Sequence, residues 1–248
     1  MPRLFLVPLA VILLVMVLYA AVVFVRLRMN IARSSVLVEK SRPFEQHPEN
    51  PRLRILVLGD STAVGTGVTD PRGSIAGRLG ADFPHADIQN LGINGLQVAG
   101  LKANFPAFPP QSFDLVVLQI GANDIVYGTP IQDFTASLST VFARATSIGK
   151  HVVALHSGNV GLAPIFEWPL DVLMRGRTLM YREWYRDIAA AQGVLYIDLF
   201  HEVKDDPFKG DGFYAADHFH PTEKGYAVWY HDLRTAMTKA GWGNLGDF

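Results

Sequence analysis

The sequence predicts an α/β fold in which a doubly wound parallel five-stranded sheet lies between two layers of helices, preceded by one N-terminal transmembrane helix. Three observations lead to this prediction. The 248 residues are 49% hydrophobic, which suits one large domain with a substantial core. An uncharged apolar run stands near the N-terminus, and from Arg54 onward short apolar runs alternate with segments of helical spacing.

The apolar run covers Leu4 to Val25. As a helix it would measure roughly 33 Å, enough to cross a hydrocarbon core of about 30 Å. A secretory signal is the main alternative, although Ala20-Ala21 offers no clear small-x-small cleavage pattern. A buried helix of a soluble protein is disfavoured because the run has no polar face. We therefore predict a membrane anchor over residues 1–29.

The net charge of −1 conceals two parts of opposite sign. Residues 1–42 contain six basic residues and one acidic residue, so the remaining chain holds 16 basic and 22 acidic residues. Most of the N-terminal basic residues follow the apolar run, and the positive-inside rule then favours a cytoplasmic body. A periplasmic or extracellular body stays open as an alternative. An acidic body without a basic stripe argues against nucleic-acid binding.

A polar segment separates the apolar run from the predicted domain. Residues 30–52 include Pro43, Pro48 and Pro51, a composition typical of a juxtamembrane linker. Residues 53–248 then form the predicted catalytic domain. The candidate strands are Arg54–Gly59, Asp87–Leu91, Leu115–Ile120, His151–Leu155 and Val194–Leu199. Most of them are apolar throughout, which is typical of a parallel sheet that is covered on both faces.

Segments of helical character stand between and after these strands. They are Ser74–Phe83, Ile131–Thr146, Asp171–Gln192 and Glu223–Ala240. Strands and helices in this alternation predict a flavodoxin-like, doubly wound domain. Ligands of such sheets bind at the carboxyl ends of the strands, so the loops that follow the strands are the places to look for a site.

Four blocks of polar residues occupy such loops or precede the last helix. They are Gly59-Asp60-Ser61, Asn90-Leu91-Gly92-Ile93-Asn94-Gly95, Gly121-Ala122-Asn123-Asp124 and Asp217-His218-Phe219-His220-Pro221. In this order they resemble the SGNH (GDSL-type) serine esterase and lipase family, over roughly residues 54–240, and in particular its membrane-anchored bacterial members. The resemblance implies the three-layer fold above and a carboxylic ester hydrolase that needs no cofactor or metal.

The residues themselves support a serine nucleophile. A serine hydroxyl reacts only when a base accepts its proton, and His220 fits that role for Ser61. Asp217, three residues before His220, can hold the imidazole in the productive tautomer. The resemblance supplies the oxyanion hole as the backbone N–H groups of Ser61 and Gly95 and the side-chain amide of Asn123. Glycine at position 95 is expected to leave room for close approach to the substrate.

Each assignment has a competing interpretation. Ser61 could simply cap a helix, and Asp60 and Asp124 are expected to order their loops. His218 could replace His220 as the base or join it in a metal site, although the family pattern Asp-x-x-His-Pro selects His220. The chain contains no cysteine, which excludes thiol catalysis and thiolate metal sites. Two other motifs fail: Ala63 breaks a Gly-x-Ser-x-Gly elbow, and residues 59–65 lack the lysine of a phosphate-binding loop.

The predicted function is hydrolysis of small-molecule or lipid acyl esters by an esterase or lysophospholipase-like enzyme, through an acyl-enzyme on Ser61. The apolar segment Val160–Pro169 either packs on the sheet or forms a hydrophobic wall for an acyl chain. O-acetyl ester cleavage or acyl transfer on a cell-surface glycan is an alternative within the same chemistry. A membrane-tethered binding module without turnover is the alternative from another class.

Overall fold

A computed structural model of the protein describes residues 3–242. The chain forms one five-stranded parallel sheet with the strand order β2-β1-β3-β4-β5. The strands are β1 (Leu53–Gly59), β2 (Ala86–Asn90), β3 (Phe113–Gln119), β4 (Gly149–Leu155) and β5 (Leu195–Ile197). The predicted fold class is confirmed, and each strand overlaps the range expected from the sequence.

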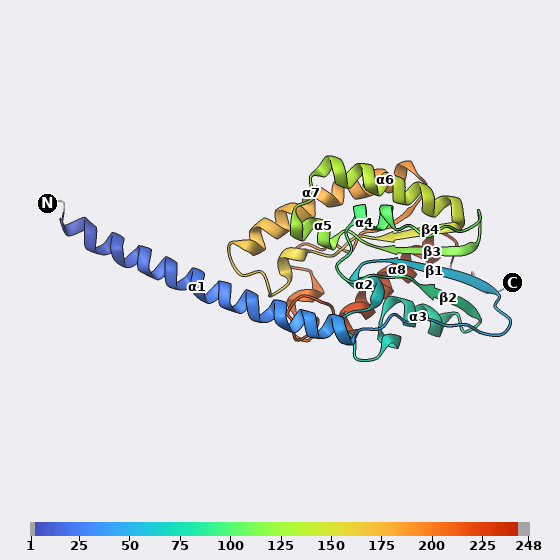
Figure 1. Cartoon of the computed structure of the whole chain (residues 1–248), viewed down its shortest axis with the longest axis horizontal. Helices are drawn as coiled ribbons and strands as arrows, with labels where there is room; N and C mark the ends of the chain where they lie inside the picture. Colours follow the sequence, from blue (N-terminus) through green and yellow to red (C-terminus); the bar gives the residue numbers. More distant parts are fainter. Residues whose placement is uncertain (1–2, 243–248) are drawn as a thin grey trace.

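Helices cover both faces of the sheet (Figure 1). The predicted ones are α1 (Arg3–Lys40), α3 (Ile75–Asp82), α6 (Ile131–Ile148), α7 (Leu170–Ala191) and α8 (Glu223–Lys239). The sequence did not predict three short helices, which are α2 (Ser61–Val64), α4 (Val98–Ala103) and α5 (Ala122–Tyr127). Three 3₁₀ turns lie at Pro71–Gly73, Val160–Leu162 and Pro207–Lys209.

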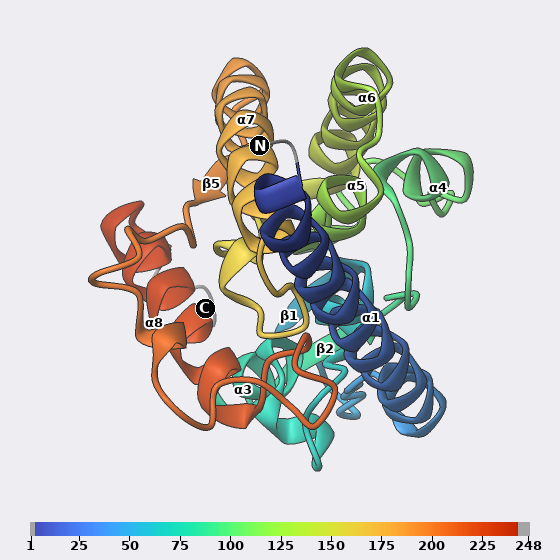
Figure 2. The same cartoon turned by 90° about the vertical axis from the view of Figure 1, so that its left-hand side faces the viewer.

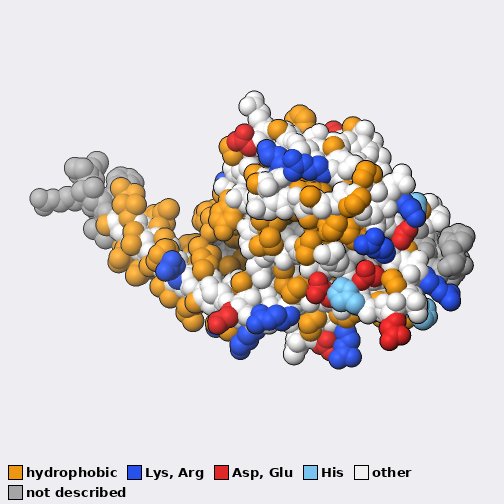
Figure 3. Space-filling model, turned by 45° about the vertical axis from the view of Figure 1, so that its right-hand side comes forward, with side chains coloured by type: hydrophobic (Ala, Val, Ile, Leu, Met, Phe, Trp, Pro, Cys, Tyr) orange, Lys and Arg blue, Asp and Glu red, His pale blue; other side chains and the backbone are white. Residues whose placement is uncertain are grey.

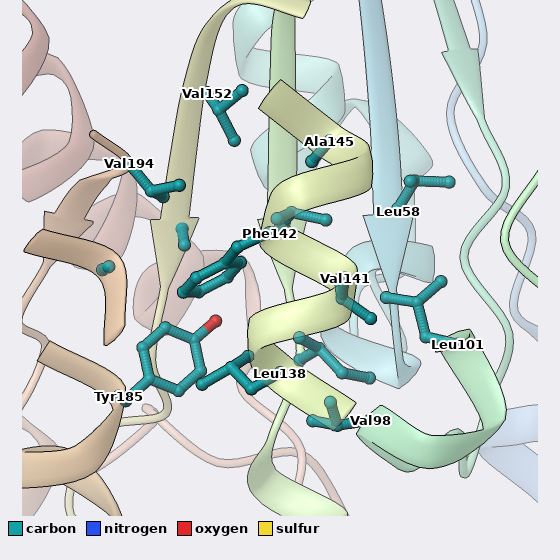
Figure 4. Packing of buried hydrophobic residues seen from close by; sticks show 14 of the residues in the cluster. Leu58, Val98, Leu101, Leu138, Val141, Phe142, Ala145, Val152, Tyr185 and Val194 are labelled. Atoms are coloured by element: carbon teal, nitrogen blue, oxygen red, sulfur yellow. The ribbon is translucent and has the colours of Figure 1, made fainter. Parts of the chain in front are cut away.

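Strand β1 shows how one apolar run serves two cores. Leu56 and Leu58 belong to the cluster beneath α4, α6 and α7, whereas Ile55 and Val57 belong to the cluster beneath α3 and α8. This alternation follows from the two-residue period of a strand. Figure 4 shows the first cluster, in which Phe142 and other side chains of α6 point toward the sheet. Each face of the strand is buried, so the sheet is held on both sides.

Helix α1 runs without interruption from Arg3 to Lys40 and projects far beyond the body (Figure 1). It is long and apolar enough to cross a membrane, with a mean hydropathy of 2.9 in its most apolar window and none of that window buried. A signal sequence would satisfy the same criteria. The helix extends eleven residues into the segment predicted as a linker. No proline or glycine stands between Pro8 and Pro43 to end it earlier.

The rest of the predicted linker is attached to the domain. The backbone of Gln46 exchanges two hydrogen bonds with Ile88 of β2, at 2.7 and 3.1 Å. The Gln46 side chain also donates to the carbonyl oxygens of Phe83 and Ala86. Within the predicted juxtamembrane linker, residues 30–40 are therefore helical and the section around Gln46 pairs with the edge of the sheet.

Candidate active site

Ser61 is the first residue of α2 and is separated from the end of β1 only by Asp60. The turn between them is tight because Gly59 has a φ of +148°, and a Cβ at that position would lie 1.9 Å from the carbonyl oxygen of Gln119. Asp60 caps α2, since its Oδ1 accepts hydrogen bonds from the backbone N–H and the hydroxyl of Thr62. Ser61 is thus fixed at the carboxyl edge of the sheet, with 6% of its surface exposed.

The structure brings Ser61 together with His220 and Asp217. The Oγ of Ser61 lies 2.9 Å from Nε2 of His220, and Nδ1 of His220 lies 2.6 Å from Oδ2 of Asp217. When Nδ1–H donates to the carboxylate, Nε2 is free to accept the serine proton. All three side chains are buried. This arrangement can generate a serine nucleophile.

Asp217 is held as a carboxylate by its hydrogen bonds. Burial raises its pKa, but the hydrogen bond with the His220 ring and those from the backbone N–H groups of Phe219 and His220 outweigh burial. The net pKa lies below the usual value. The two backbone bonds measure 3.1 Å each and both reach Oδ1, leaving Oδ2 for the imidazole.

The two remaining predicted residues, Gly95 and Asn123, border the same groove as Ser61 and His220. Nδ2 of Asn123 donates to the carbonyl oxygen of Leu96 at 3.0 Å, which joins the loop after β3 to the loop after β2. Gly95 has a φ of +76°, and a Cβ there would meet nothing within 4 Å. The left-handed backbone therefore favours glycine at position 95, and no neighbouring protein atom would obstruct a Cβ there.

Two cavities meet at Ser61, and Asn123, Phe219 and His220 border both. The smaller one has a volume of about 60 Å³ and extends into the body beneath Trp229. The larger is a groove of about 480 Å³. Both are mainly apolar. Part of the segment Val160–Pro169 lines each of them, so this apolar segment lies beside Ser61.

Asp124 orders the loops around the site. It is fully buried, and its carboxylate accepts hydrogen bonds from the backbone N–H of Val98 and from the hydroxyl of Thr129. Asn90, at the end of β2, donates to the carbonyl oxygen of Ala63 in α2 and accepts from the N–H of Gly92. These contacts fix the loops after β1, β2 and β3 relative to one another.

His218 is separated from this arrangement. It is exposed, its backbone has a φ of +60°, and its side chain borders a different hollow together with Arg26 and Arg33. The structure therefore places His220, and not His218, against Ser61. Within residues 3–242, no group of three or more His, Asp or Glu side chains is arranged to hold a metal ion.

The sequence interpretation missed two features near Ser61. His156 follows β4, is completely buried, and packs its ring against Tyr185; burial lowers its pKa to about 4, so it is neutral. It lines a small cavity together with Gln119 and Asp60. The second feature is α1, whose residues between Leu27 and Glu39 form one side of the larger groove. No local pattern signals this long-range contact.

Comparison with known proteins agrees with the fold. Residues 57–228 match the model of the GDSL-like Lipase/Acylhydrolase family. No curated protein sequence matches the chain significantly. A lipolytic G-D-S-L family protein from Veillonella parvula shares 22% identity at a TM-score of 0.58, with 75% of this chain and 98% of that chain covered.

Two further solved structures show the same fold. The acetylxylan esterase Axe2 from Geobacillus stearothermophilus is 20% identical at a TM-score of 0.56, with 76% of this chain and 95% of that one covered. The lipase Lip_vut3 from a goat rumen metagenome is 18% identical at a TM-score of 0.59, with coverages of 78% and 99%. The family match spans well over half of this sequence, and the chain therefore belongs to the GDSL-like lipase and acylhydrolase family.

Proposed function

We propose that the protein hydrolyses carboxylic esters through an acyl-enzyme on Ser61. The observation that carries the proposal is the continuous hydrogen-bond chain from Ser61 Oγ through His220 to the Asp217 carboxylate. Family membership supports the same reaction class. His220 acts as the general base and Asp217 stabilises the imidazolium that forms.

In the first half-reaction, the Ser61 proton moves to Nε2 of His220 as Oγ bonds to the ester carbonyl carbon. The carbonyl oxygen becomes an oxyanion, which the N–H groups of Ser61 and Gly95 and the amide of Asn123 stabilise. Collapse of the tetrahedral intermediate breaks the bond to the alcohol, which leaves with the proton from Nε2. Water then attacks the acyl-enzyme by the same steps and releases the acid.

The two apolar cavities at Ser61 support an ester with at least one hydrocarbon part, as in esterase or lysophospholipase-like activity. The smaller cavity gives the O-acetyl esterase alternative a specific basis. A cavity of about 60 Å³ holds only a few water-sized groups and suits a short acyl group. Acetyl esters and long-chain esters are therefore the two substrate types to compare.

The apolar part of α1 serves, in this proposal, as a membrane anchor for the enzyme. Its support is the length, hydropathy and complete exposure of the apolar window. In Figure 3, hydrophobic side chains cover the projecting helix and continue onto the adjoining surface of the body. A retained span would be found in the membrane fraction at full length, whereas a cleaved signal would leave a shorter soluble protein.

The experiment uses the full chain in bilayer nanodiscs. The Ser61→Ala variant should lose labelling by a fluorophosphonate probe, and Ser61→Ala and His220→Ala should each lose on the order of 10⁴-fold or more in ester hydrolysis. Ser147→Ala and His218→Ala are the matched controls, since both wild-type side chains are exposed and neither lines the two cavities at Ser61. Unchanged hydrolysis by Ser61→Ala would disprove the mechanism. A wild-type chain that neither reacts with the probe nor cleaves esters would indicate the binding module.

A further inference from the structure

The larger groove lies between the body and α1. Its floor is formed by the site itself, including Ser61 and His220, and the loop residues Ile165 and Phe166 border it. The opposite wall belongs to α1 and consists of Leu27, Ile31, Ser34, Ser35, Val38 and Glu39. Figure 2, which looks at the carboxyl end of the sheet, shows α1 crossing diagonally in front of the body. The helix that carries the apolar run therefore also encloses the catalytic serine.

The residues of α1 that approach the body follow a regular spacing. The positions with reduced exposure are Val23, Leu27, Asn30, Ser34 and Leu37, with Val38 beside them. The intervals of four and three residues place them on one face of the helix. Val36 lies outside this face and is 48% exposed. Leu27, Ser34 and Val38 of this set also line the groove.

Three side-chain contacts hold this face in place. Tyr19 donates to the carbonyl oxygen of Trp168 at 2.9 Å, and Arg26 pairs with Glu167 at 3.1 Å. Beyond the groove, Asn94 donates to the hydroxyl of Ser41 at 3.1 Å. The contacts lie at both ends of the segment that lines the groove. Surface pairs of this kind are individually weak, but together they fix the register of α1 on the body.

We propose that α1 is a specificity-determining part of the active site, and that the groove between α1 and the body binds the hydrocarbon chain of an amphiphilic ester. The inference rests on the proposed function, because it assigns the substrate class of the same site. The side chains of Leu27, Ile31 and Val38 face apolar residues of the body, which include Val126, Phe166 and Phe219. Each methylene buried there adds about fourfold to affinity.

The position of the groove along α1 favours a substrate that comes from a membrane. Leu27 is the second residue after the uncharged run ends at Val25, so the groove begins where the apolar part of α1 ends. The loop at Trp168 contacts α1 further back, at Tyr19 within the run. Trp168 itself is 63% exposed, and Val172 and Leu173, at the start of α7, are also exposed. A chain leaving the bilayer along α1 therefore passes apolar side chains until it reaches Ser61.

The test compares two valines on α1. Val38→Trp fills the groove, whereas Val36→Trp places the same side chain two residues away on the exposed face. Full-length variants in nanodiscs are assayed on p-nitrophenyl acetate, p-nitrophenyl dodecanoate and dodecyl acetate. The measured quantity is the ratio of kcat/KM for a long-chain ester, either p-nitrophenyl dodecanoate or dodecyl acetate, to kcat/KM for p-nitrophenyl acetate. We expect Val38→Trp to lower this ratio at least tenfold for one of the long-chain esters, and Val36→Trp to leave it unchanged. Ile31→Ala, which widens the groove without adding bulk, should lower the ratio severalfold.

The outcomes are distinct. A loss confined to the dodecanoate assigns the chain to the acyl part, and a loss confined to dodecyl acetate assigns it to the alcohol part; both support the proposal. If the ratio of kcat/KM for the long-chain esters to that for p-nitrophenyl acetate is the same in Val38→Trp, Ile31→Ala and Val36→Trp, the proposal is overturned. If the groove proposal is overturned in this way, the proposed function still holds provided that p-nitrophenyl acetate is hydrolysed by the wild-type chain and not by Ser61→Ala. Absence of all ester hydrolysis in the wild-type chain would instead refute the proposed function.

Discussion

The side-chain amide of Asn123 is hydrogen-bonded to the carbonyl oxygen of Leu96, the residue next to Gly95, with 3.0 Å between Nδ2 and O. The contact joins the loops that carry two of the proposed oxyanion-hole donors. An amide nitrogen has two hydrogens, so one can hold Leu96 while the other remains available to the substrate. In the proposed mechanism Asn123 therefore has two tasks, to donate to the oxyanion and to position Gly95.

Replacing Asn123 by alanine should remove both the bond to Leu96 and the proposed bond to the oxyanion. We expect kcat to fall on the order of 100- to 1000-fold, the usual cost of one oxyanion donor. Because the interaction strengthens as charge develops on the oxygen, KM should change little. Steady-state kinetics on p-nitrophenyl acetate measure the two parameters separately. A rise in KM with unchanged kcat would assign Asn123 to ground-state binding alone.

Gly95 and Gly212 form a matched pair. Both have positive φ, +76° and +80°, and at both positions a Cβ would meet nothing within 4 Å. Alanine should therefore cost each variant about 1 kcal/mol of stability through backbone strain. Only Gly95→Ala should also lose turnover, because the strain acts on the N–H group that we propose as an oxyanion donor. Thermal unfolding and ester kinetics of the two variants test this, and equal activities would exclude Gly95 from the oxyanion hole.

Asp217→Asn should retain the fold of the loop but impair the base. Asparagine can still accept the backbone N–H bonds at Oδ1. Its amide then faces Nδ1 and favours the imidazole tautomer with the proton on Nε2, which cannot accept the proton of Ser61. A loss in kcat on the order of 10⁴-fold is expected. Fluorophosphonate labelling rates provide an independent measurement, and wild-type rates would show that Asp217 does not orient His220.

Asp60 gives a prediction about pH and stability. Burial raises the pKa of its carboxyl to about 6, against the lowering effect of the hydrogen bonds from Thr62. Its other oxygen, Oδ2, is buried without a hydrogen-bond partner in the described part of the chain. The carboxyl group of Asp60 therefore binds a proton more tightly in the folded protein than in the unfolded chain. The free energy of unfolding should fall as the pH rises from about 4 to about 6, and this loss of stability persists at higher pH.

Asp60→Asn keeps an Oδ1 acceptor for Thr62 and removes the charge. Its free energy of unfolding, relative to wild type, should rise between about pH 4 and pH 6 and then stay constant, with a total gain of about 3 kcal/mol. Urea denaturation at several pH values measures the difference. Asp114→Asn is a useful contrast, because hydrogen bonds with Lys150 and Arg54 outweigh burial and lower the pKa of Asp114. That substitution should destabilise the protein at neutral pH.

The sequence predicted the sheet well because β1, β3 and β4 each contain an apolar run, and three of the four motif blocks stand where strands end. It missed α2, α4 and α5, which have four to six residues and are too short to show a helical period. These helices depend on caps and contacts, such as the Asp60 side chain for α2. The extension of α1 to Lys40 was obscured by polar residues that nonetheless contain no helix breaker before Pro43.

The site residues could be proposed from their types, whereas the details of their geometry could not. Ser61, His220 and Asp217 could be proposed from their chemistry and order, and their mutual distances follow from the loops that meet at the sheet edge. The backbone angle of Gly95 and the bond from Asn123 to Leu96 depend on tertiary structure, which a motif does not encode. The same holds for the groove wall on α1, a contact between segments far apart in the chain.

The continuity of α1 has a kinetic consequence. One rigid helix joins the apolar run to the groove wall, and contacts at Tyr19, Arg26 and Ser41 prevent it from swinging away from the body. If the run lies in a bilayer, Ser61 is held at a constant height above the surface. The enzyme then samples esters in two dimensions, so its rate should follow their mole fraction in the membrane and decline on dilution with inert lipid at constant bulk concentration.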